Sequence, residues 1–376
     1  MALAGTALFF SGWRAYGKRP MGARRARMER SPNWKGGHFV NPEPMQNDLV
    51  GAALGIVHKS HYTTPDEPIA PQAVTARNFK MPPVTWLGVT WFGHSTFLVE
   101  IEGCRILVDP VWSERISPVS IAGPKRWYGP LIPIGELPRI DAVVISHDHY
   151  DHLDYPTIRA MKDWSTTTFV VPLGVGAHLE YWGIPPGRIV ELDWWERTRV
   201  RGVDLVATPA RHISGRTLGL GDSGTLWSGW AFLGKLRRVY YSGDTGLFPG
   251  ITEIGDRLGP FDLTLIEAGE YGHWWSDWHL GPEQAVLAHQ WVRGRVLLPV
   301  HWGLFTLAYH AWTEPIERVL VAAKKSGVRV AAPKPGQTIE PIASQPTERW
   351  WPVLPGKTVE ADPIISSHTE SIREGR

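Results

Sequence analysis

The residues best suited to chemistry lie in one short run, DAVVISHDHYDHLD, at residues 141–154. This run brings His147, His149, Asp151 and His152 within six consecutive positions. Alternate side chains of an extended chain share a face, so His147, His149 and Asp151 can converge, and His152 can join them if the chain turns. Three imidazoles and a carboxylate packed so closely are best explained by a shared divalent metal ion.

Three further residues of types that bind metals each come at or just after the end of an apolar stretch. Each stretch is typical of a buried strand. His212 follows VDLVA, Asp244 follows RVYYS, and His301 follows VLLPV. Side chains placed at the ends of neighbouring strands gather along one edge of a sheet, where rigid strands support a site. The predicted metal ligands are therefore His147, His149, Asp151, His152, His212, Asp244 and His301.

Seven ligands are too many for one tetrahedral ion, and they suit two ions that share a carboxylate. Two divalent ions exceed the charge of two carboxylates, which favours a bridging hydroxide and an anionic substrate oxygen. A metal ion also lowers the pKa of bound water towards about 7. The expected reaction is hydrolysis, but the ligand spacing does not distinguish a phosphodiester from a carboxylic ester, lactone or amide.

The surrounding sequence predicts the elements that position these ligands. The apolar residues 142–145 predict a strand that ends at the ligand loop. Asp154 and Pro156 predict the start of a helix through TIRAMKDW. Helices are also predicted at Pro282–Trp291 and at Glu314–Ser326. Strands and helices that alternate in this way indicate the α/β class.

Composition limits the remaining classes of function. The chain has 376 residues, of which 43% are hydrophobic, and a net charge of +2 that does not favour nucleic acid as a partner. Its single cysteine, Cys104, excludes an internal disulfide and a CxxC zinc pair. Histidine and carboxylate must therefore hold any metal, and they accept zinc, iron and manganese. Most of the 20 tryptophans are expected in the core, and a minority in an apolar cleft or a membrane-facing rim.

We predict three parts along the chain: an N-terminal extension at 1–83, a hydrolase domain at 84–340 and a C-terminal tail at 341–376. Residues 1–30 join an apolar start to seven arginines and lysines, and they are either disordered or associated with anionic membrane. The rest of the extension is rich in proline and glycine and is expected to be irregular. The end of the tail, 356–376, is expected to be disordered.

The HxHxDH motif with a distant His, Asp and His resembles the metallo-β-lactamase superfamily. This resemblance implies a four-layer αββα sandwich with a dinuclear site on one edge, and it covers about residues 85–340. One metal would then be held by His147, His149 and His212, and the other by Asp151, His152 and His301, with Asp244 as the bridge. Asp151 is also expected to be essential for catalysis.

A closer resemblance comes from KGGHFVNP, WFGHSTFLVE, DPVWSERISP, SGDTG and PVHWGLFTLA, within segments that run in order from about residue 35 to 335. Together they are similar to the N-acyl-phosphatidylethanolamine-hydrolysing phospholipase D family. The resemblance implies two zinc ions, cleavage of the phosphodiester bond distal to the glyceride, and release of phosphatidic acid and an N-acylethanolamine. It also implies a phospholipid substrate, a homodimer, and a cytoplasmic location peripheral to the membrane surface.

The same resemblance assigns roles to residues near the metals. His279 matches a family histidine and is expected to orient the phosphate or to protonate the leaving alkoxide. Asp109 matches an aspartate that steadies a metal ligand, and His94 in the GHST turn is expected near the site. The segment IEAGEYGHWWSDWH departs from the family pattern, so Glu267 and Trp278 are expected to support the site or to line the substrate cleft.

Three other functions remain open from the sequence. A soluble hydrolase of lactones or small phosphodiesters would have the same ligands and would keep the tryptophans in its core. A metal-dependent nuclease is disfavoured by the near-neutral charge and by an apolar rather than basic aromatic neighbourhood. A non-catalytic scaffold is disfavoured because no ligand position has been lost.

Overall fold

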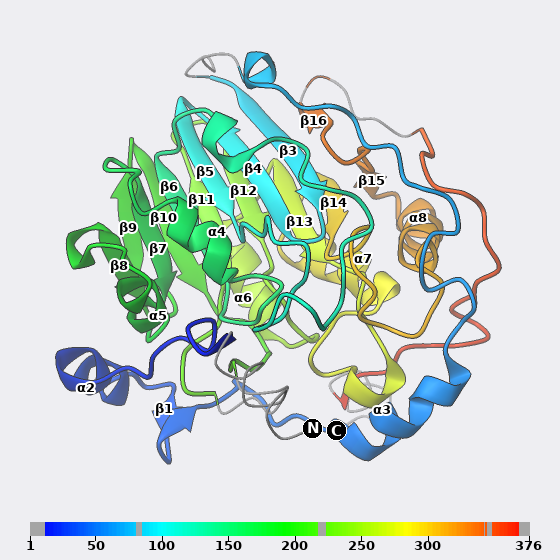
Figure 1. Cartoon of the computed structure of the whole chain (residues 1–376). Coiled ribbons are helices and arrows are strands. Elements are labelled where there is room, and N and C mark those ends of the chain that lie inside the picture. The colour runs from blue at the N-terminus through cyan, green and yellow to red at the C-terminus, as the bar shows by residue number, and fades with distance from the viewer. Residues whose placement is uncertain (1–11, 80–84, 217–222, 342, 344–347, 368–376) are drawn as a thin grey trace.

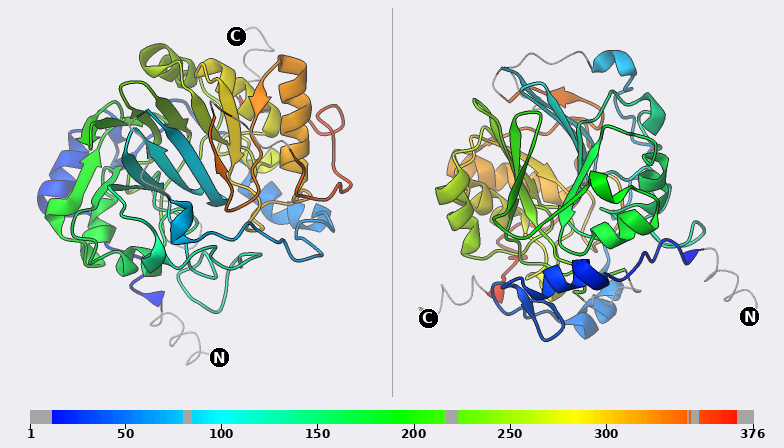
Figure 2. Two further views of the ribbon diagram at one scale, coloured as in Figure 1. Left: turned by 90° about the horizontal axis from the view of Figure 1, so that it is seen from above. Right: turned by 90° about the vertical axis from the view of Figure 1, so that its left-hand side faces the viewer.

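The computed structural model describes residues 12–79, 85–216, 223–341, 343 and 348–367. In this part of the chain, two seven-stranded sheets pack face to face. Helices cover the outer face of each sheet, as Figure 1 and the right-hand view of Figure 2 show. The structure confirms the predicted α/β class and the four-layer αββα sandwich.

The first sheet has the strand order β16-β3-β4-β5-β6-β7-β8. Its strands are β3 (Leu87–Gly93), β4 (Thr96–Ile101), β5 (Cys104–Val108), β6 (Ala142–Val144), β7 (Thr168–Pro172), β8 (Ile189–Leu192) and β16 (Thr338–Ile339). Strands β16, β3, β4 and β5 pair antiparallel, whereas β5 to β8 pair parallel. Strand β6 is the one predicted before the ligand loop, and its three residues are buried on both faces, as expected for a parallel strand.

The second sheet has the order β15-β14-β13-β12-β11-β10-β9. Its strands are β9 (Arg197–Val200), β10 (Val203–Thr208), β11 (Gly229–Leu233), β12 (Arg238–Tyr241), β13 (Leu263–Glu267), β14 (Val296–Val300) and β15 (Arg329–Val330). Strands β9 to β12 form an antiparallel meander, and β12 to β15 are parallel. The strands predicted from VDLVA, RVYYS and VLLPV are therefore present as β10, β12 and β14.

Successive side chains of each strand point to opposite faces of its sheet, so the apolar residues form three layers. Val99 and Val144 of the first sheet meet Leu205 and Leu265 of the second in the central core. Neighbouring residues such as Val143 face outwards, against the helix layer. That outer layer contains α4 (Tyr155–Ala160) and α5 (Gly176–Tyr181), and the layer on the second sheet contains α6 (Gly250–Leu258), α7 (Pro282–Trp291) and α8 (Glu314–Ser326).

Helices α7 and α8 have the predicted bounds, but α4 is shorter than predicted and ends at Ala160. Asp154 stands at its N-cap position, yet its side chain does not cap the helix amides. The carboxylate instead accepts hydrogen bonds from the backbone N–H and the hydroxyl of Ser113, at 3.1 and 2.8 Å. Asp154 therefore fixes the loop after β5 beside the ligand loop.

The N-terminal extension contains regular elements that the sequence analysis did not predict. Helix α2 (Gly22–Glu29) lies in the segment expected to be disordered or membrane-associated. The part expected to be irregular contains the hairpin of β1 (Trp34–Lys35) and β2 (His38–Phe39), α3 (Leu49–Gly55), and the 3-10 turns η1 (Ile56–His58) and η2 (Ala76–Asn78). Both α2 and α3 lie along one edge of the sandwich, below the sheets in the right-hand view of Figure 2. Within the described ranges, no helix has the length and apolar character needed to span a bilayer. Residues 1–11 of the predicted anchor lie outside the described residues.

The C-terminal segment was expected to be disordered from residue 356, but it packs on the domain as far as residue 367. Trp351 is buried in the core between the sheets, and Ile364 and Ser366 are also buried. Ser366 lies 3.3 Å from the side-chain amide of Gln284 on α7. Burial of these side chains stabilises a segment whose polar, proline-rich composition gave no such signal. Residues 368–376 lie outside the described part.

Candidate metal centre

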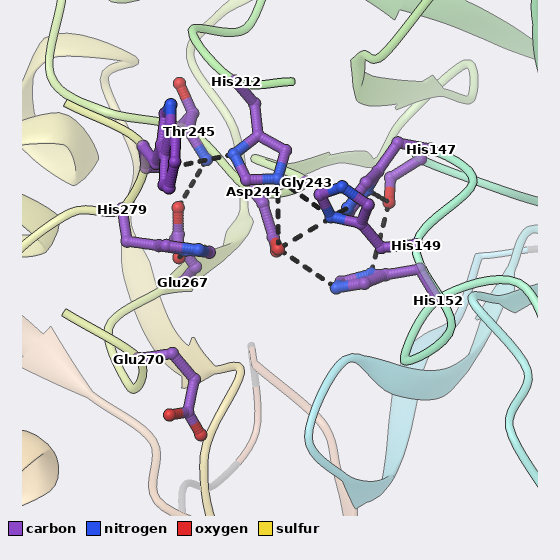
Figure 3. A network of polar contacts seen from close by, with 12 residues as sticks. His147, His149, His152, His212, Gly243, Asp244, Thr245, Glu267, Glu270 and His279 are labelled. Carbon is purple, nitrogen blue, oxygen red and sulfur yellow. Dashed lines mark hydrogen bonds and ion pairs between the residues drawn. The ribbon is translucent and has the colours of Figure 1, made fainter. Parts of the chain in front are cut away.

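All predicted metal ligands lie at one edge of the sandwich, just beyond the carboxyl ends of four strands. The loop after β6 carries His147, His149, Asp151 and His152, and the remaining three follow β10, β12 and β14. The backbone N–H of His152 donates to the carbonyl of His149 at 3.1 Å, so the chain turns within the motif. This turn brings His152 back towards the other ligands, as Figure 3 shows.

One group of three imidazoles forms on the side of β10. Nδ1 of His149 lies 2.9 Å from Nε2 of His147 and 3.3 Å from Nε2 of His212. The three ligand atoms all lie within 4.8 Å of one another. These residues could hold one metal ion, and they are the three that the resemblance assigned to the first metal (Figure 3).

A second group centres on Asp151. Its Oδ2 atom lies 3.2 Å from Nε2 of His152 and 3.4 Å from Nε2 of His301. Nε2 of His94 lies 2.9 Å from the same oxygen, and all four ligand atoms lie within 4.8 Å of one another. Asp151, His152 and His301 could hold a second ion, and His94 holds the carboxylate of Asp151 in place.

Asp244 lies between the two groups. Its Oδ2 atom is 3.7 Å from Nε2 of both His147 and His212. The same oxygen is 3.1 Å from Nε2 of both His152 and His301. One carboxylate oxygen therefore faces both sets of imidazoles, which is the position that a ligand bridging two metal ions requires.

The donor set fits divalent metal better than it fits a network of hydrogen bonds. Nε2 of His152 and Nε2 of His301 face each other at 3.2 Å. Oδ1 of Asp244 is buried and has no hydrogen-bond partner among the described residues. Buried polar atoms are normally paired, so nitrogens and oxygens gathered in this way call for a shared cation.

The electrostatics favour the same conclusion. Burial lowers the pKa of His147 and of His212 well below the ordinary value, so both imidazoles are neutral and can act as ligands. Burial alone would raise the pKa of Asp244, but His152 and His301 hold it well below its usual range. The carboxylate therefore stays ionised, and against the effect of burial it raises the pKa of His301 to about 10, so without metal a proton supplies the positive charge between them.

Asp109 supports the site from below, at the end of β5. Its Oδ2 atom lies 2.8 Å from Nδ1 of His152, and it also accepts hydrogen bonds from the hydroxyls of Ser146 and Tyr241 at 2.6 and 2.7 Å. Asp109 is fully buried. By holding Nδ1 of His152, it directs Nε2 of that ring towards the ligands.

Three residues of the site have left-handed backbone conformations that non-glycine residues rarely adopt. The φ angles are 52° at His94, 39° at Asp109 and 66° at His301. The N–H of His301 donates to the carbonyl of His94 at 3.0 Å, and the N–H of His94 donates to the carbonyl of Trp302 at 2.9 Å. These bonds tie the edges of the two sheets together and maintain the strained conformations that aim the side chains.

His279 lies beside the metal ligands and is positioned by Glu267. Oε2 of Glu267 is 2.6 Å from Nδ1 of His279, and Oε1 accepts a hydrogen bond from the backbone N–H of Thr245. Glu267 is fully buried at the end of β13, so it supports His279 from behind and does not line the cleft. Figure 3 shows Glu267 and His279 side by side near His212.

A cavity of about 290 Å³ opens onto the candidate ligands. Its wall contains His149, Asp151, Asp244, Glu270, Trp275, Trp278, His279, His301, Leu307 and Tyr309. Trp278 lines this cavity, and its carbonyl lies 3.0 Å from Nδ1 of His212. The wall combines aromatic side chains with metal-ligand residues.

Glu270 is a residue of this wall that the sequence analysis did not identify. It is only 6% exposed, and burial raises its pKa well above the ordinary value. Burial therefore disfavours the charged form of this carboxyl group. Its place in the IEAGEYGHWWSDWH segment, three residues after Glu267, was the one signal in the sequence.

Comparison with known proteins agrees with the fold and the ligand pattern. A family described as "Beta-lactamase superfamily domain" matches residues 104–302, more than half of the chain. An uncharacterized protein of Mycobacterium tuberculosis is 46% identical over 333 residues, which cover 87% of this chain and 89% of that protein. N-acyl-phosphatidylethanolamine-hydrolyzing phospholipase D 1 of Caenorhabditis elegans is 39% identical over 233 residues, covering 59% of this chain and 65% of that protein.

Solved structures share the fold at lower identity. The isothiocyanate hydrolase from Delia radicum gut bacteria superposes with a TM-score of 0.54 at 18% identity, covering 67% of this chain and 98% of that one. Among the relatives found by sequence, a metal-dependent hydrolase of Pyrobaculum aerophilum is 29% identical over 248 residues, covering 64% of this chain and 97% of that protein. The chain therefore belongs to the metallo-β-lactamase superfamily and is a metal-dependent hydrolase.

Proposed function

We propose that this protein is a dinuclear zinc phosphodiesterase of the phospholipase D type, which cleaves N-acyl-phosphatidylethanolamine to phosphatidic acid and an N-acylethanolamine. The observation that carries the proposal is the pair of ligand groups joined by Asp244 at the mouth of an aromatic-walled cavity. The name of the relative from Caenorhabditis elegans supports the choice of substrate.

In this proposal the metals are held as the geometry groups the ligands. His147, His149 and His212 would hold one ion, and Asp151, His152 and His301 the other, with Asp244 shared. When bound, two zinc ions would stabilise the charge on the phosphoryl oxygens and supply a nucleophile at neutral pH. Aromatic side chains such as Trp278 would exclude water around the bond to be cleaved.

His279 is proposed as the general acid. Glu267 accepts the hydrogen bond of Nδ1, which leaves Nε2 as the ring nitrogen available to substrate. Since His279 lines the cavity next to His301, a proton on Nε2 can pass to the leaving oxygen of the N-acylethanolamine.

The exposed apolar surface of α3 and η1 supports binding of the protein to a membrane. Five apolar side chains there are between 52% and 78% exposed: Leu49, Val50, Leu54, Ile56 and Val57. Gly51 and Gly55 of α3 pack against the ring of Trp274, which directly precedes the cavity residue Trp275. We propose that this apolar surface rests on the bilayer and brings the cavity to its lipid.

The basic N-terminal segment contributes less to this contact than its sequence indicates. Nε of Arg24 lies 2.7 Å from a carboxylate oxygen of Glu191, and Nη2 of Arg27 lies 2.6 Å from one of Glu196. These arginines attach α2 to the domain, so their charge is largely compensated before any anionic lipid approaches. Apolar contact through α3 is therefore the main contribution to the free energy of the proposed membrane binding.

Product analysis by mass spectrometry tests the proposed reaction. Zinc-loaded protein would be incubated with N-acyl-phosphatidylethanolamine in mixed micelles, with Asp151→Asn as the control. Release of N-acylethanolamine and phosphatidic acid by the wild type alone is the expected result. No release, with cleavage of bis-nitrophenyl phosphate retained, would reject the lipid substrate.

That second outcome would favour a soluble hydrolase of lactones or small phosphodiesters. A cavity of about 290 Å³ lies at the lower end of the range for small-molecule sites, which is the observation that supports this alternative.

A further inference from the structure

We propose that a second cavity, behind the metal-ligand loop, binds a phosphomonoester group. This cavity of about 450 Å³ is separate from the metal centre and is bounded by the N-terminal segment and by residues next to the ligand loop. Lys18, Arg19, Arg25 and Arg216 line it beside the carboxylate of Asp148, and Nε of Arg25 lies 2.7 Å from a carboxylate oxygen of Glu29. Lys18 and Arg216 together exceed the charge of Asp148, which favours an anionic ligand.

Two buried polar groups in its wall lack partners. Arg216 is 4% exposed and Thr225 is 3% exposed. Nη2 of Arg216 and the hydroxyl oxygen of Thr225 have no hydrogen-bond partner among the described residues. Buried donors of this kind are nearly always paired in folded proteins, so their position in one cavity wall indicates a ligand that brings acceptor oxygens.

The chemistry of the wall selects a phosphate group. A guanidinium offers forked N–H donors that match the oxygens of a phosphate, and an ammonium adds a point charge. The side chain of Lys18 is exposed and makes no ion pair with the described residues. The carboxylate of Asp148 would repel an anion, but two contacts reduce this repulsion. One oxygen accepts a hydrogen bond from the backbone N–H of Gly215 at 2.7 Å, and the other lies 3.3 Å from Nε2 of His178.

The size of the cavity indicates that the phosphate is carried on a larger molecule. A volume of about 450 Å³ falls within the range of sites for small molecules and is much larger than one phosphate ion needs. A lipid headgroup and a soluble phosphomonoester share this chemistry, and the experiment below distinguishes them. The proposal does not depend on the phospholipase activity.

The cavity is coupled to the metal-ligand loop through Arg216. Nη1 of Arg216 donates hydrogen bonds to the carbonyl oxygens of Asp148 and Leu153, at 2.5 and 2.9 Å. Asp148 lies between His147 and His149 in the chain. A phosphate held by Nη2 would fix the guanidinium that braces this loop, so ligand binding is expected to stabilise the loop as well as the N-terminal segment.

Calorimetric titration of the full-length, zinc-loaded protein with glycerol 3-phosphate tests the proposal. Lys18→Gln and Thr225→Val are the test variants, and Lys324→Gln, which removes an exposed lysine from α8, is the matched control. We expect wild type and Lys324→Gln to bind equally, and each test variant to bind at least about tenfold more weakly. Phosphate held by the metal centre would not respond to Lys18 or Thr225, so the difference between variants reports on this cavity.

Flotation with vesicles identifies the source of the phosphate. Phosphatidylcholine vesicles with and without phosphatidic acid would be mixed with wild type, Lys18→Gln and Thr225→Val. Binding that depends on phosphatidic acid and on both residues would assign the cavity to a lipid headgroup. Glycerol 3-phosphate binding without this dependence would assign it to a soluble ligand. If neither probe distinguishes the two test variants from wild type, the proposal is wrong.

Discussion

The buried carboxylate of Glu267 lies 2.6 Å from Nδ1 of His279, and this contact directs Nε2 of the imidazole towards the cavity. A Glu267→Gln substitution keeps the size of the side chain but can turn an N–H towards Nδ1. We expect kcat to fall about 10- to 100-fold with little change in KM, because substrate contacts remain while the ring orientation is lost.

Steady-state kinetics on the lipid substrate would measure this effect, with zinc content checked in the same samples. Glu253→Gln, an exposed residue on α6, is the matched control and should behave as wild type. An unchanged kcat in Glu267→Gln would show that the orientation of His279 does not matter.

His279 itself is expected to matter more than its partner. His279→Ala removes the proposed proton donor, and we expect kcat to fall about 10²- to 10⁴-fold with two zinc ions still bound. The measurement is turnover together with metal analysis by mass spectrometry. A variant with full metal content and full turnover would rule out a catalytic role for His279.

Asp109 provides a test of the metal centre that does not depend on the substrate. Because Asp109 holds Nδ1 of His152, Asp109→Asn is expected to weaken zinc binding about 10- to 100-fold at the ion that His152 holds. Competition with a chromogenic chelator measures this affinity. Asp163→Asn changes an aspartate whose side chain is 84% exposed, and it should leave the affinity unchanged. Equal affinities for both variants would contradict the role of Asp109.

Membrane binding is expected to depend on α3 and η1. Val50→Asp and Val57→Asp place a charge on side chains that are 70% and 78% exposed, and they should reduce binding to phospholipid vesicles at least tenfold. Leu236→Asp is the control, since Leu236 is 60% exposed in the turn before β12, at the end of the sheet opposite the metal ligands. Loss of binding in the control alone would place the membrane contact elsewhere.

Because His289 on α7 is buried, we expect the folded protein to lose stability in acid. Burial lowers the pKa of His289 to about 4, and its Nδ1 atom lies 2.7 Å from the hydroxyl of Thr264. The unfolded chain takes up this proton below about pH 6.5, whereas the folded protein resists it until about pH 4. Stability should therefore fall by about 3 kcal/mol over this range as pH decreases.

Urea unfolding at several values of pH between 4 and 7 measures that loss. His289→Gln removes the titrating group, so its free energy of unfolding should depend less steeply on pH than that of the wild type. If the free energy of unfolding depends on pH equally in the two proteins, another group is responsible for the loss of stability.

The sequence predicted those parts of the molecule whose pattern is local. The motif at 141–154 and the apolar stretches before Asp244 and His301 indicated both the ligands and the strands that place them. The bounds of α8 were predicted correctly because periodic apolar residues and terminal lysines agree there, and α7 begins at Pro282, a residue that suits the first turn of a helix. The order of strands in the two sheets was not predicted from the sequence and is known only from the structure.

The remainder depends on contacts between distant parts of the chain. The short helix α3 gave no signal, because its apolar residues face outwards instead of forming a stripe towards a core. Glu267 supports His279 only because the chain after β13 returns over the end of that strand, which no spacing in the sequence reveals. The buried tail was missed because Trp351 joins a core whose other members are far away in the chain.

The stacked tryptophans of the central core have a consequence for synthesis on the ribosome. Trp302, which directly follows the ligand His301, stacks on Trp91 and on Trp350, with ring centroids 5.5 and 5.3 Å apart. The core is therefore completed by residues near the end of the chain. The apolar surface of strands that are translated earlier stays exposed until this segment leaves the ribosome. A truncated product that ends before Trp350 would therefore be prone to aggregation or degradation.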